Sequence, residues 1–444
     1  MPTNTENASS QVAGAPSSIP TMNAAKARRR AVWAGIAGQI LEWFDYAVYG
    51  TLAPILSVVF FPTKDPVISI LLTLLAFGVG FVMRPLGSVL FGHIGDKYGR
   101  KAALSGTIYI MAIATASIGF IPSYASIGIA APLILTTCRL LQGVSTGGEW
   151  GGSTAFLVEY AKSKGRGFLG SWQQAGAVVG FMIGALLGVI LTNFMSKASL
   201  TAWGWRLPFI IGSVILGYVG WFIRSQIEDT PSFREAEQKK QVVRNPVLTS
   251  LRENWVGVLQ AGGLSTGWNA GFYLVLTFMP TYITTTLKLP LNLSLLTNMF
   301  TCMAFIILTP TMGHISDKIG RKKVLFTSCF CYLFFTYPIF LYMRDGTFFK
   351  VLLAQFILCL FASMFSGPGV AFIAEMFPTN VRMSTLIGYN VMAALAGGMG
   401  PFYCAYLVRL THNSAAPSFY MMAAITVSII TIASLPETFD KPLR

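Results

Sequence analysis

The chain has 444 residues, of which 54% are hydrophobic and 11% are charged. Soluble domains carry about 25% charged residues, so the composition excludes an ordinary soluble protein and predicts an all-α, polytopic membrane protein. The net charge of +15 does not indicate a nucleic-acid partner, because the basic residues lie in short connections between apolar runs. The three histidines and six cysteines have no metal-ligand spacing, so we expect neither a metal nor a cofactor.

Residues 1–25 are rich in Ser, Thr, Asn, Ala and Pro, which predicts a disordered cytoplasmic tail. Twelve apolar runs follow, each about as long as the roughly 20 residues that cross a bilayer, or longer. They lie at about 31–60, 67–91, 103–121, 128–158, 168–194, 207–224, 255–286, 293–313, 324–343, 348–374, 384–408 and 417–435. This order predicts a six-helix bundle over 26–224, a cytoplasmic linker over 225–254, a second six-helix bundle over 255–435 and a cytoplasmic tail over 436–444.

The basic residues gather in alternate connections between the apolar runs. The clusters are Lys26 to Arg30, Lys97 to Lys101, Lys162 to Arg166, Lys239 to Arg252, Lys318 to Lys323 and Lys441 to Arg444. Connections on the other side, such as 122–127 and 287–292, are nearly uncharged. Cytoplasmic loops carry an excess of Lys and Arg, so we expect a multi-pass protein of the bacterial cytoplasmic membrane with both termini in the cytoplasm.

The two halves of the chain repeat each other. GHIGDKYGRK begins at Gly92 and GHISDKIGRK begins at Gly313, with eight of ten positions identical. Glu159 and Arg166 are seven residues apart, as are Glu375 and Arg382, 216 residues further on. Duplicated bundles are typical of secondary transporters that hold substrate between them near the membrane midplane.

These motifs resemble the major facilitator superfamily over the whole apolar length. Within it, the chain is similar to the metabolite:proton symporters. The matching stretches are LEWFDYAVYG at 41–50, RPLG at 84–87, RLLQGVSTGGEWGG at 139–152, RGFLGSW at 166–172, GWRLPF at 204–209 and LPET at 435–438. That family carries organic acids and also zwitterionic osmolytes such as proline and betaine, so the motifs do not name the substrate.

Ionisable side chains at membrane depth all lie in the N-terminal half. Each acidic group costs roughly 2.5–3.5 kcal/mol to insert, yet the first run carries both Glu42 and Asp45. The resemblance implies that Asp45 carries the coupling proton, with Arg139 as its counter-charge. A carboxylate that loses such a partner in a dry cavity takes up a proton. Glu42 either shares this proton or only orients the cavity.

The candidate substrate contacts are polar or aromatic groups in apolar surroundings. Arg84 is either an anion contact or a cation that reaches back to the cytoplasmic interface. Arg139, Gln142 and Trp150 share one helical stripe, which lines the cavity or packs against another helix. The remaining candidates are Gln173, Asn269, Tyr273 and Asn390.

The repeated loop motifs predict a cytoplasmic gate. Its acidic and basic members are Asp96, Arg100, Glu159, Arg166, Asp317, Arg321, Glu375 and Arg382. The resemblance implies that these pairs hold the bundles together when the carrier opens outward. Positive-inside anchoring alone explains the basic residues but not the repeated Asp and Glu.

A second pattern concerns helix packing. Gly176, Gly180, Gly184 and Gly188 follow one another at four-residue spacing. Small residues at this period let two helix backbones approach closely, so we expect this helix to pack tightly on a neighbour.

The expected function is symport of a small organic acid anion with protons into the cell, by a chain that functions as a monomer. Uptake of a zwitterionic osmolyte is the alternative within the family. A transporter-like receptor that binds ligand without accumulating it is an alternative of another class. No P-loop, catalytic triad or metal motif is present in the sequence, so we do not expect an enzyme.

Overall fold

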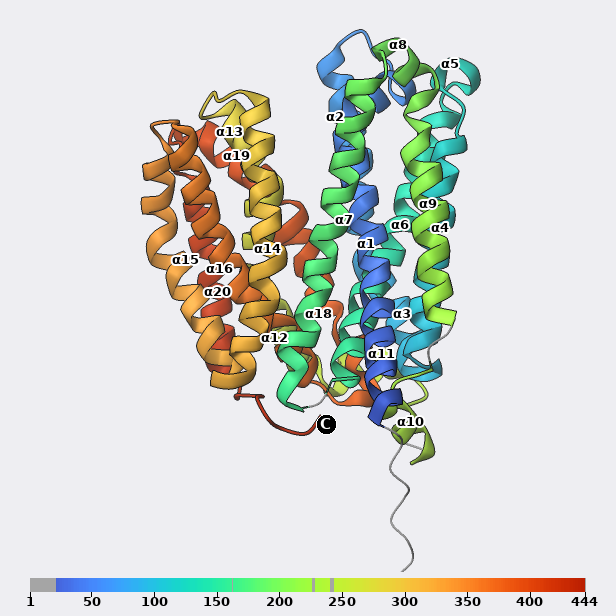
Figure 1. Ribbon diagram of the computed structural model, residues 1–444, viewed down its shortest axis with the longest axis vertical. Coiled ribbons are helices and arrows are strands. Elements are labelled where there is room, and N and C mark those ends of the chain that lie inside the picture. Colours follow the sequence, from blue (N-terminus) through green and yellow to red (C-terminus); the bar gives the residue numbers. More distant parts are fainter. Residues whose placement is uncertain (1–20, 162, 226–227, 240–242, 444) are drawn as a thin grey trace, which may run out of the picture.

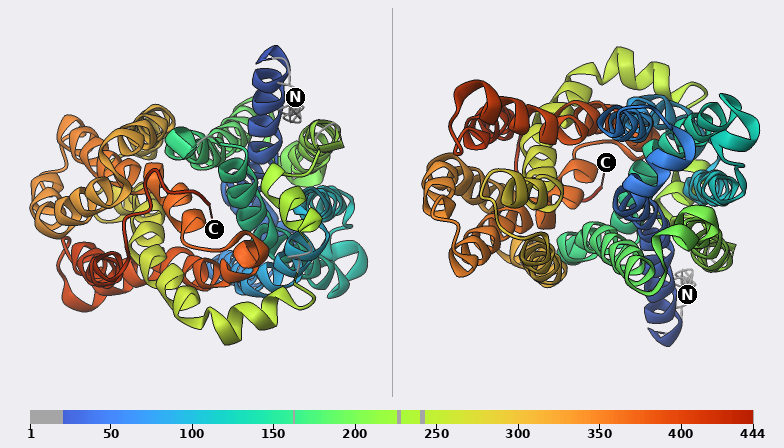
Figure 2. Two further views of the ribbon diagram at one scale, coloured as in Figure 1. Left: turned by 90° about the horizontal axis from the view of Figure 1, so that it is seen from below. Right: turned by 90° about the horizontal axis from the view of Figure 1, so that it is seen from above.

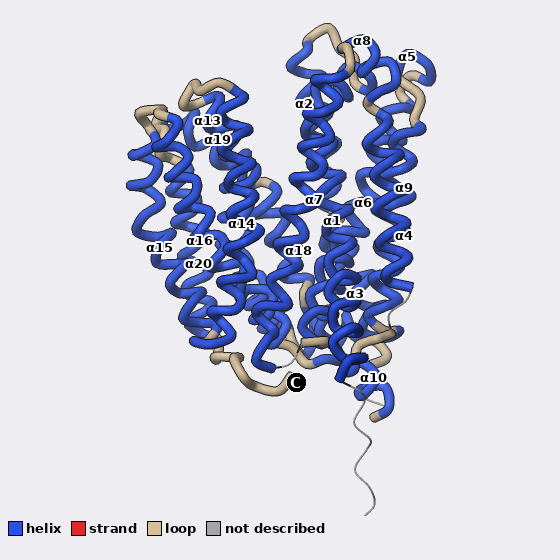
Figure 3. The backbone as a smooth tube through the Cα atoms, viewed as in Figure 1, coloured by secondary structure: helices blue, strands red, loops and turns tan. Residues whose placement is uncertain are grey.

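The computed structural model describes residues 21–161, 163–225, 228–239 and 243–443 (Figure 1). Within these residues the secondary structure is helical, with no β-strand (Figure 3). The expected disordered tail lies outside the described residues up to residue 20. Residues 21–25 correct that expectation, because helix α1 begins at Thr21; Ala24 and Ala25 are strong helix formers and the helix continues into the first apolar run.

The N-terminal bundle contains the helices that the first six apolar runs predict. They are α1 (Thr21–Phe60), α2 (Pro66–Val82), α3 (Arg84–Tyr98), α4 (Arg100–Phe120), α5 (Tyr124–Ile127), α6 (Ala130–Glu159), α7 (Arg166–Phe194), α8 (Lys197–Ser199) and α9 (Arg206–Ser225). The expected linker is not featureless, since it contains α10 (Pro231–Gln238) and α11 (Pro246–Glu253). Both short helices begin at a proline, whose fixed φ suits a first helical position.

The C-terminal bundle is built from more broken helices. They are α12 (Trp255–Tyr273), a π-helical turn (Leu274–Phe278), α13 (Met279–Thr285), α14 (Leu291–Ile319), α15 (Arg321–Met343), α16 (Phe348–Glu375), α17 (Arg382–Thr385), α18 (Ile387–Met392), a second π-helical turn (Ala393–Gly398), α19 (Gly400–Thr411) and α20 (Pro417–Ser434). Breaks of this kind are tolerated at membrane depth where neighbouring protein surrounds the backbone.

Ten helical stretches in the described part of the chain are long and apolar enough to cross a membrane. Helix α6 and the run from α12 to α13 do not qualify, because Gly, Ser, Thr and amide side chains lower their hydropathy. Both nevertheless pack inside their bundles, α6 against α3 and α4, and α12 against α18 and α20. Counting these two, the described residues contain twelve candidate membrane-spanning segments, six in each bundle.

The two bundles stand side by side (Figures 1 and 2). They meet at the end that carries the loops at Lys97–Lys101 and Lys318–Lys323, which we name the basic end. There α3 contacts α17 and α18, and α7 contacts α14 and α16. Towards the opposite end the bundles diverge in Figure 1. Helix α10 and the C-terminal end of the chain both lie at the basic end.

A break between α2 and α3 sets the position of one buried cation. Pro85 is the second residue of α3 and has no N–H to continue the hydrogen bonding of α2. The backbone turns at Met83, and the Arg84 side chain that follows is buried at 2% exposure. The predicted single run of 67–91 is therefore two helices, and the proline explains the interruption.

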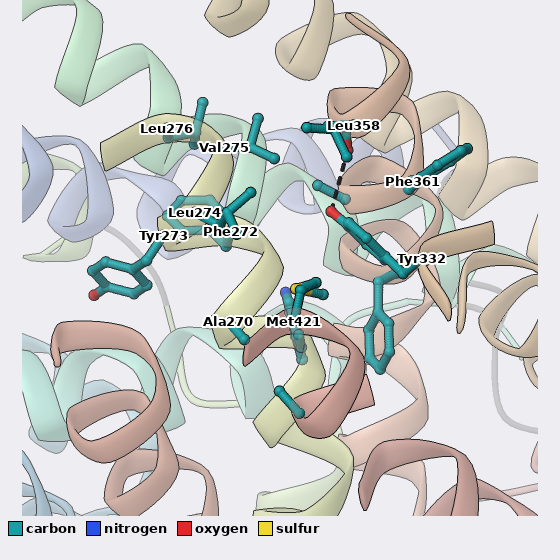
Figure 4. Packing of buried hydrophobic residues seen from close by; sticks show 14 of the residues in the cluster. Ala270, Phe272, Tyr273, Leu274, Val275, Leu276, Tyr332, Leu358, Phe361 and Met421 are labelled. Atoms are coloured by element: carbon teal, nitrogen blue, oxygen red, sulfur yellow. Dashed lines mark hydrogen bonds between the residues drawn. The ribbon is translucent and has the colours of Figure 1, made fainter. Parts of the chain in front are cut away.

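The core of the C-terminal bundle is formed by α12 with its π-helical turn, α15, α16 and α20 (Figure 4). Tyr332 of α15 is fully buried, and its hydroxyl donates to the carbonyl oxygen of Leu358 at 3.1 Å. Tyr273 belongs to the same cluster. One face of α12 thus packs into the bundle core, which holds the residues next to the bundle interface in fixed positions.

The glycine stripe of α7 lies against α1. A methyl group at Gly180 would press on the Ile40 carbonyl oxygen, and one at Gly184 would lie 2.5 Å from the Phe44 carbonyl oxygen. The two backbones therefore approach more closely than alanine allows, as the spacing predicts.

We predict that Gly180→Ala lowers the stability of the protein by roughly 1–3 kcal/mol, the usual cost of overpacking. Gly50→Ala is the matched control, since a methyl group at this helical position meets no atom within 4 Å. It should leave stability unchanged or raise it, because Ala favours helix over Gly. Melting temperatures in detergent check the pair. Equal melting temperatures for both variants would contradict the close approach.

Candidate functional site

A small cavity lies at the interface of the two bundles. Its lining comes from α1, α3, α6 and α7 on one side and from α12 and α18 on the other. The lining side chains are mostly aromatic or amide groups, and of those described only Arg84 is charged. They are Gln39, Trp43, Arg84, Trp150, Gln174, Trp268, Asn269, Phe272, Tyr273 and Tyr389.

Aromatic rings from both bundles form the walls of this cavity. Trp150 stacks on Tyr389, with ring centroids 3.3 Å apart and planes at 8°. Trp268 meets both rings edge-on, 5.7 Å from Trp150 and 5.4 Å from Tyr389. Trp43 packs against Phe272 at 5.1 Å. The cavity walls are therefore built largely from aromatic rings that both bundles contribute.

Arg84 joins the bundles at the edge of the cavity. Its Nη1 donates to the Tyr273 hydroxyl at 3.4 Å, and its Nε donates to Asn390 Oδ1 at 3.5 Å. Nη1 also lies 4.0 Å from Glu42 Oε1. Of the two interpretations of Arg84 from the sequence, the structure therefore excludes the cation that reaches back to the interface, because this guanidinium is buried between the bundles.

Asp45 and Arg139 form a buried ion pair inside the N-terminal bundle. Arg139 Nη1 lies 2.5 Å from Asp45 Oδ2, and the guanidinium stacks on the Tyr49 ring at 3.8 Å. Asp45 Oδ1 also accepts from Gln142 Nε2 at 3.0 Å and from the Thr115 hydroxyl at 3.3 Å. The carboxylate is thus well compensated, and neither Asp45 nor Arg139 lines the cavity.

Two glutamines expected to contact substrate have other partners. Gln142 belongs to the Asp45 network. Gln173 donates to the Ser153 hydroxyl at 2.7 Å and to the Trp150 carbonyl oxygen at 2.9 Å, so it ties α7 to α6. Its neighbour Gln174 lines the cavity instead. In this arrangement Arg139, Gln142 and Gln173 bind partners within the N-terminal bundle and do not line the cavity.

A second buried ion pair was missed from the sequence. Arg224 of α9 contacts both carboxylate oxygens of Glu149, and the Thr107 hydroxyl donates to the same carboxylate at 2.5 Å. Arg224 ends a membrane-crossing helix, where a cation is ordinarily an interfacial anchor. The signal that could have found it is Glu149 itself, an acidic residue at membrane depth without an assigned partner.

Glu42 differs from the other buried acids. Its side chain is 1% exposed, and neither carboxylate oxygen has a hydrogen-bond partner among the described residues. Among the described residues, Arg84 is the only cation within ion-pair distance of Glu42, with its Nη1 4.0 Å from Glu42 Oε1. Glu42 lines a second small cavity together with Glu149 and Ser145.

The gate residues of the first motif hold the bundles together at the basic end. Asp96 of α3 accepts from the backbone N–H groups of Met383 and Ser384, at 3.2 and 2.8 Å. Arg100 pairs with Asp96 at 2.6 Å and with Glu159 at 3.1 Å. Glu159 in turn pairs across the interface with Arg382 at 2.5 Å.

The second motif repeats this arrangement in the other direction. Asp317 of α14 accepts from the backbone N–H groups of Gly167 and Phe168, at 2.9 and 2.8 Å. These N–H groups lie in the first turn of α7, where they have no acceptor within the helix and where the helix dipole favours an anion. Arg321 pairs with Asp317 at 2.7 Å and with Glu375 at 3.3 Å, and Arg166 lies 3.7 Å from Glu375 across the interface.

Each gate half also contains an acid and a threonine from the segment that follows the last helix of its bundle, and these residues were not predicted. Asp229 accepts from the backbone N–H of Arg100 at 2.9 Å, and Glu437 accepts from that of Arg321 at 3.1 Å. Thr230 and Thr438 follow these acids and donate to Glu159 and Glu375. Burial raises the pKa of Asp229, which lies in the connection after α9, while the backbone donors oppose that rise.

Comparison with known proteins identifies the family. Residues 31–256 match the family described as "Sugar (and other) transporter", and residues 270–442 match the "Major Facilitator Superfamily". The chain belongs to the major facilitator superfamily. The solved structure of the proton:xylose symporter XylE bound to 6-bromo-6-deoxy-D-glucose has the same fold, with a TM-score of 0.81, 17% identity, and coverage of 94% of this chain and 98% of that one.

Relatives within the superfamily are more similar in sequence. A glycine betaine/proline/ectoine/pipecolic acid transporter of Dickeya dadantii is 36% identical over 94% of this chain and 85% of the relative. A proline/betaine transporter of Escherichia coli K12 is 34% identical with the same coverage. This chain is therefore similar to carriers of small molecules, and a multi-pass transporter fold is the setting for the cavity.

The gate leads to a prediction for Arg382→Gln. This change removes the cation that joins Glu159 to the other bundle, so the basic end should open more often. Spin labels at Tyr98 and Lys323, exposed residues of opposite bundles, should acquire a longer-distance component in pulsed electron resonance. Arg234→Gln is the control, because Arg234 forms an exposed pair with Glu228 on one side of the interface. An unchanged distance distribution in folded Arg382→Gln protein would refute the gate.

Proposed function

We propose that this protein is a proton-coupled symporter that takes up a zwitterionic osmolyte of the betaine or proline type. The single observation that carries the proposal is the cavity between the bundles, where several aromatic rings surround a space bordered by one guanidinium. A quaternary ammonium binds to ring faces, and a carboxylate binds to a guanidinium. Betaine carries both groups at opposite ends of a short molecule.

The amides around the cavity complete this recognition. Gln39, Gln174 and Asn269 supply neutral donors and acceptors, which orient a polar ligand without changing the charge balance. Proline fits the same description, because its ring is apolar and its ammonium and carboxylate groups are adjacent. The names of the similar relatives support this class of substrate.

The expectation of an organic acid anion receives less support. A di- or tricarboxylate entering a water-excluded cavity needs a cation for each charge, and Arg84 is the only charged residue among the described lining. Arg139, which was expected to bind such an anion, is occupied by Asp45 and lies outside the lining. The osmolyte alternative therefore agrees better with the charge of the lining.

Transport in this proposal proceeds by rocking of the two bundles. The basic end faces the cytoplasm by the positive-inside rule, which also puts both termini there, in a bacterial cytoplasmic membrane. The gate pairs close that end, so in this proposal the substrate enters from the opposite end. Because one chain contains both walls of the cavity, we propose that the monomer transports.

The first test is uptake of labelled betaine by reconstituted vesicles with an imposed pH gradient. Trp150→Ala should weaken apparent betaine affinity about tenfold, the value expected for losing a cation–π contact of 1–2 kcal/mol. Trp150→Phe keeps a ring and should lose less. Trp203→Ala is the control, because Trp203 is 52% exposed outside the cavity. Citrate uptake in place of betaine uptake would overturn the substrate class, and binding without accumulation would indicate a receptor.

The second test concerns the coupling acid. Asp45→Asn removes the charge that pairs with Arg139, so accumulation driven by the pH gradient should fall below that of the unsubstituted protein, while exchange of betaine across the membrane survives. Exchange needs no net proton movement, which separates coupling from binding. Asp65→Asn, a change in the connection between α1 and α2, is the control. Normal accumulation by Asp45→Asn with lumenal acidification in step would refute the assignment.

A further inference from the structure

We propose that Glu42 takes up a proton when the carboxylate of the substrate binds Arg84, so that this guanidinium links the cavity to a proton site behind it. The inference rests on the proposed function, since it requires a substrate with a carboxylate. It assigns a separate role to the acid that sequence reasoning left without one.

Glu42 and Asp45 have different surroundings. Asp45 receives Arg139, Gln142 and Thr115 as donors. Glu42 receives no hydrogen bond from any described residue, although both its oxygens are buried. A buried carboxylate without donors has a large desolvation cost in its charged form. The charge of Glu42 in this arrangement therefore depends on the one cation nearby.

That cation is held loosely. The hydrogen bonds of Arg84 to Tyr273 and Asn390 measure 3.4 and 3.5 Å, and its distance to Glu42 is 4.0 Å. Good N–H···O bonds measure about 2.7–3.2 Å, so each contact is at or beyond the long end of this range. A substrate carboxylate that offers two oxygens to the planar guanidinium forms a better pair.

The geometry lets one guanidinium serve both anions in turn. Arg84 lines the substrate cavity, whereas Glu42 lines the second cavity. When Arg84 turns to the substrate, Glu42 loses its compensating charge. A proton from the external medium then binds to a Glu42 carboxylate oxygen, and no bond in the substrate is made or broken. The loaded site carries one more proton than the empty site.

The other charged and titratable groups around Glu42 do not replace Arg84. They are Asp45 and Tyr46 on its own helix, Glu149 on α6, Arg224 on α9, Tyr273 on α12 and Tyr389 on α18. The tyrosines are neutral. Asp45 is paired with Arg139, and Arg224 is paired with Glu149. The nearby acids raise the cost of a charge on Glu42, and the second arginine is already engaged.

The test measures proton uptake on ligand binding in the purified full-length protein. Calorimetric titration with betaine in two buffers of different ionisation enthalpy counts the protons, and repeating it across pH gives the linkage. For the unsubstituted protein we expect uptake of one proton on binding. Betaine affinity should then weaken as the pH rises, by up to about tenfold per pH unit, which is the slope for one linked proton. For Glu42→Gln we expect affinity independent of pH.

A second variant and a second ligand serve as controls. Asp65→Asn should retain the pH dependence of betaine affinity, since Asp65 lies in the connection between α1 and α2 and does not line the cavity. Choline carries the trimethylammonium group without a carboxylate, so the unsubstituted protein should bind it without proton uptake. Glu42→Gln that keeps the pH dependence, or choline binding that takes up the same proton, would overturn the inference. Failure of the unsubstituted protein to bind betaine would instead overturn the proposed function.

Discussion

The cost of burying charge in a membrane protein is the constraint on which this structure depends. Every ionised side chain at membrane depth needs an opposite charge or several donors, and the fold satisfies this requirement with pairs that join different helices. Asp45 with Arg139 joins α1 to α6, and Glu149 with Arg224 joins α6 to α9. Such pairs fix the N-terminal bundle as a unit. Glu42 is the exception, because its one nearby cation, Arg84, also lines the cavity. The charge of Glu42 is compensated only while Arg84 stays beside it, so binding at the cavity can change its protonation.

The gate at the basic end also consists of buried charges that are compensated by partners on other helices. Asp96 and Asp317 accept hydrogen bonds from backbone N–H groups at the starts of helices in the opposite bundle. These contacts are made across the interface, so they are lost when the bundles separate, whereas the pairs inside a bundle persist. Because the chain is duplicated, the gate has two nearly equivalent halves, and the rocking motion that we propose would break both together.

The fold could be predicted from the sequence because three patterns are strong: apolar runs of membrane length, basic loops on one side and the repeat at Gly92 and Gly313. The site could be predicted only in part. Gln173 and Gln174 lie about 100° apart on one helix, and only the neighbouring helices decide which faces the cavity. Arg224 ends an apolar run and so resembles an anchor. Trp150 and Tyr273 were predicted as substrate contacts and both line the cavity, but the packing of the rings on one another could not be predicted, because they come from helices far apart in the chain.

The coupling between substrate and proton is tested most directly by measuring proton movement driven by substrate alone. Vesicles containing the protein and a lumenal pH dye, with membrane potential held at zero, receive betaine on the outside without an imposed pH gradient. We expect the lumen to acidify as betaine enters and choline to cause no acidification, because in the proposed coupling the substrate carboxylate on Arg84 brings the proton. Betaine entry with constant lumenal pH would contradict this coupling.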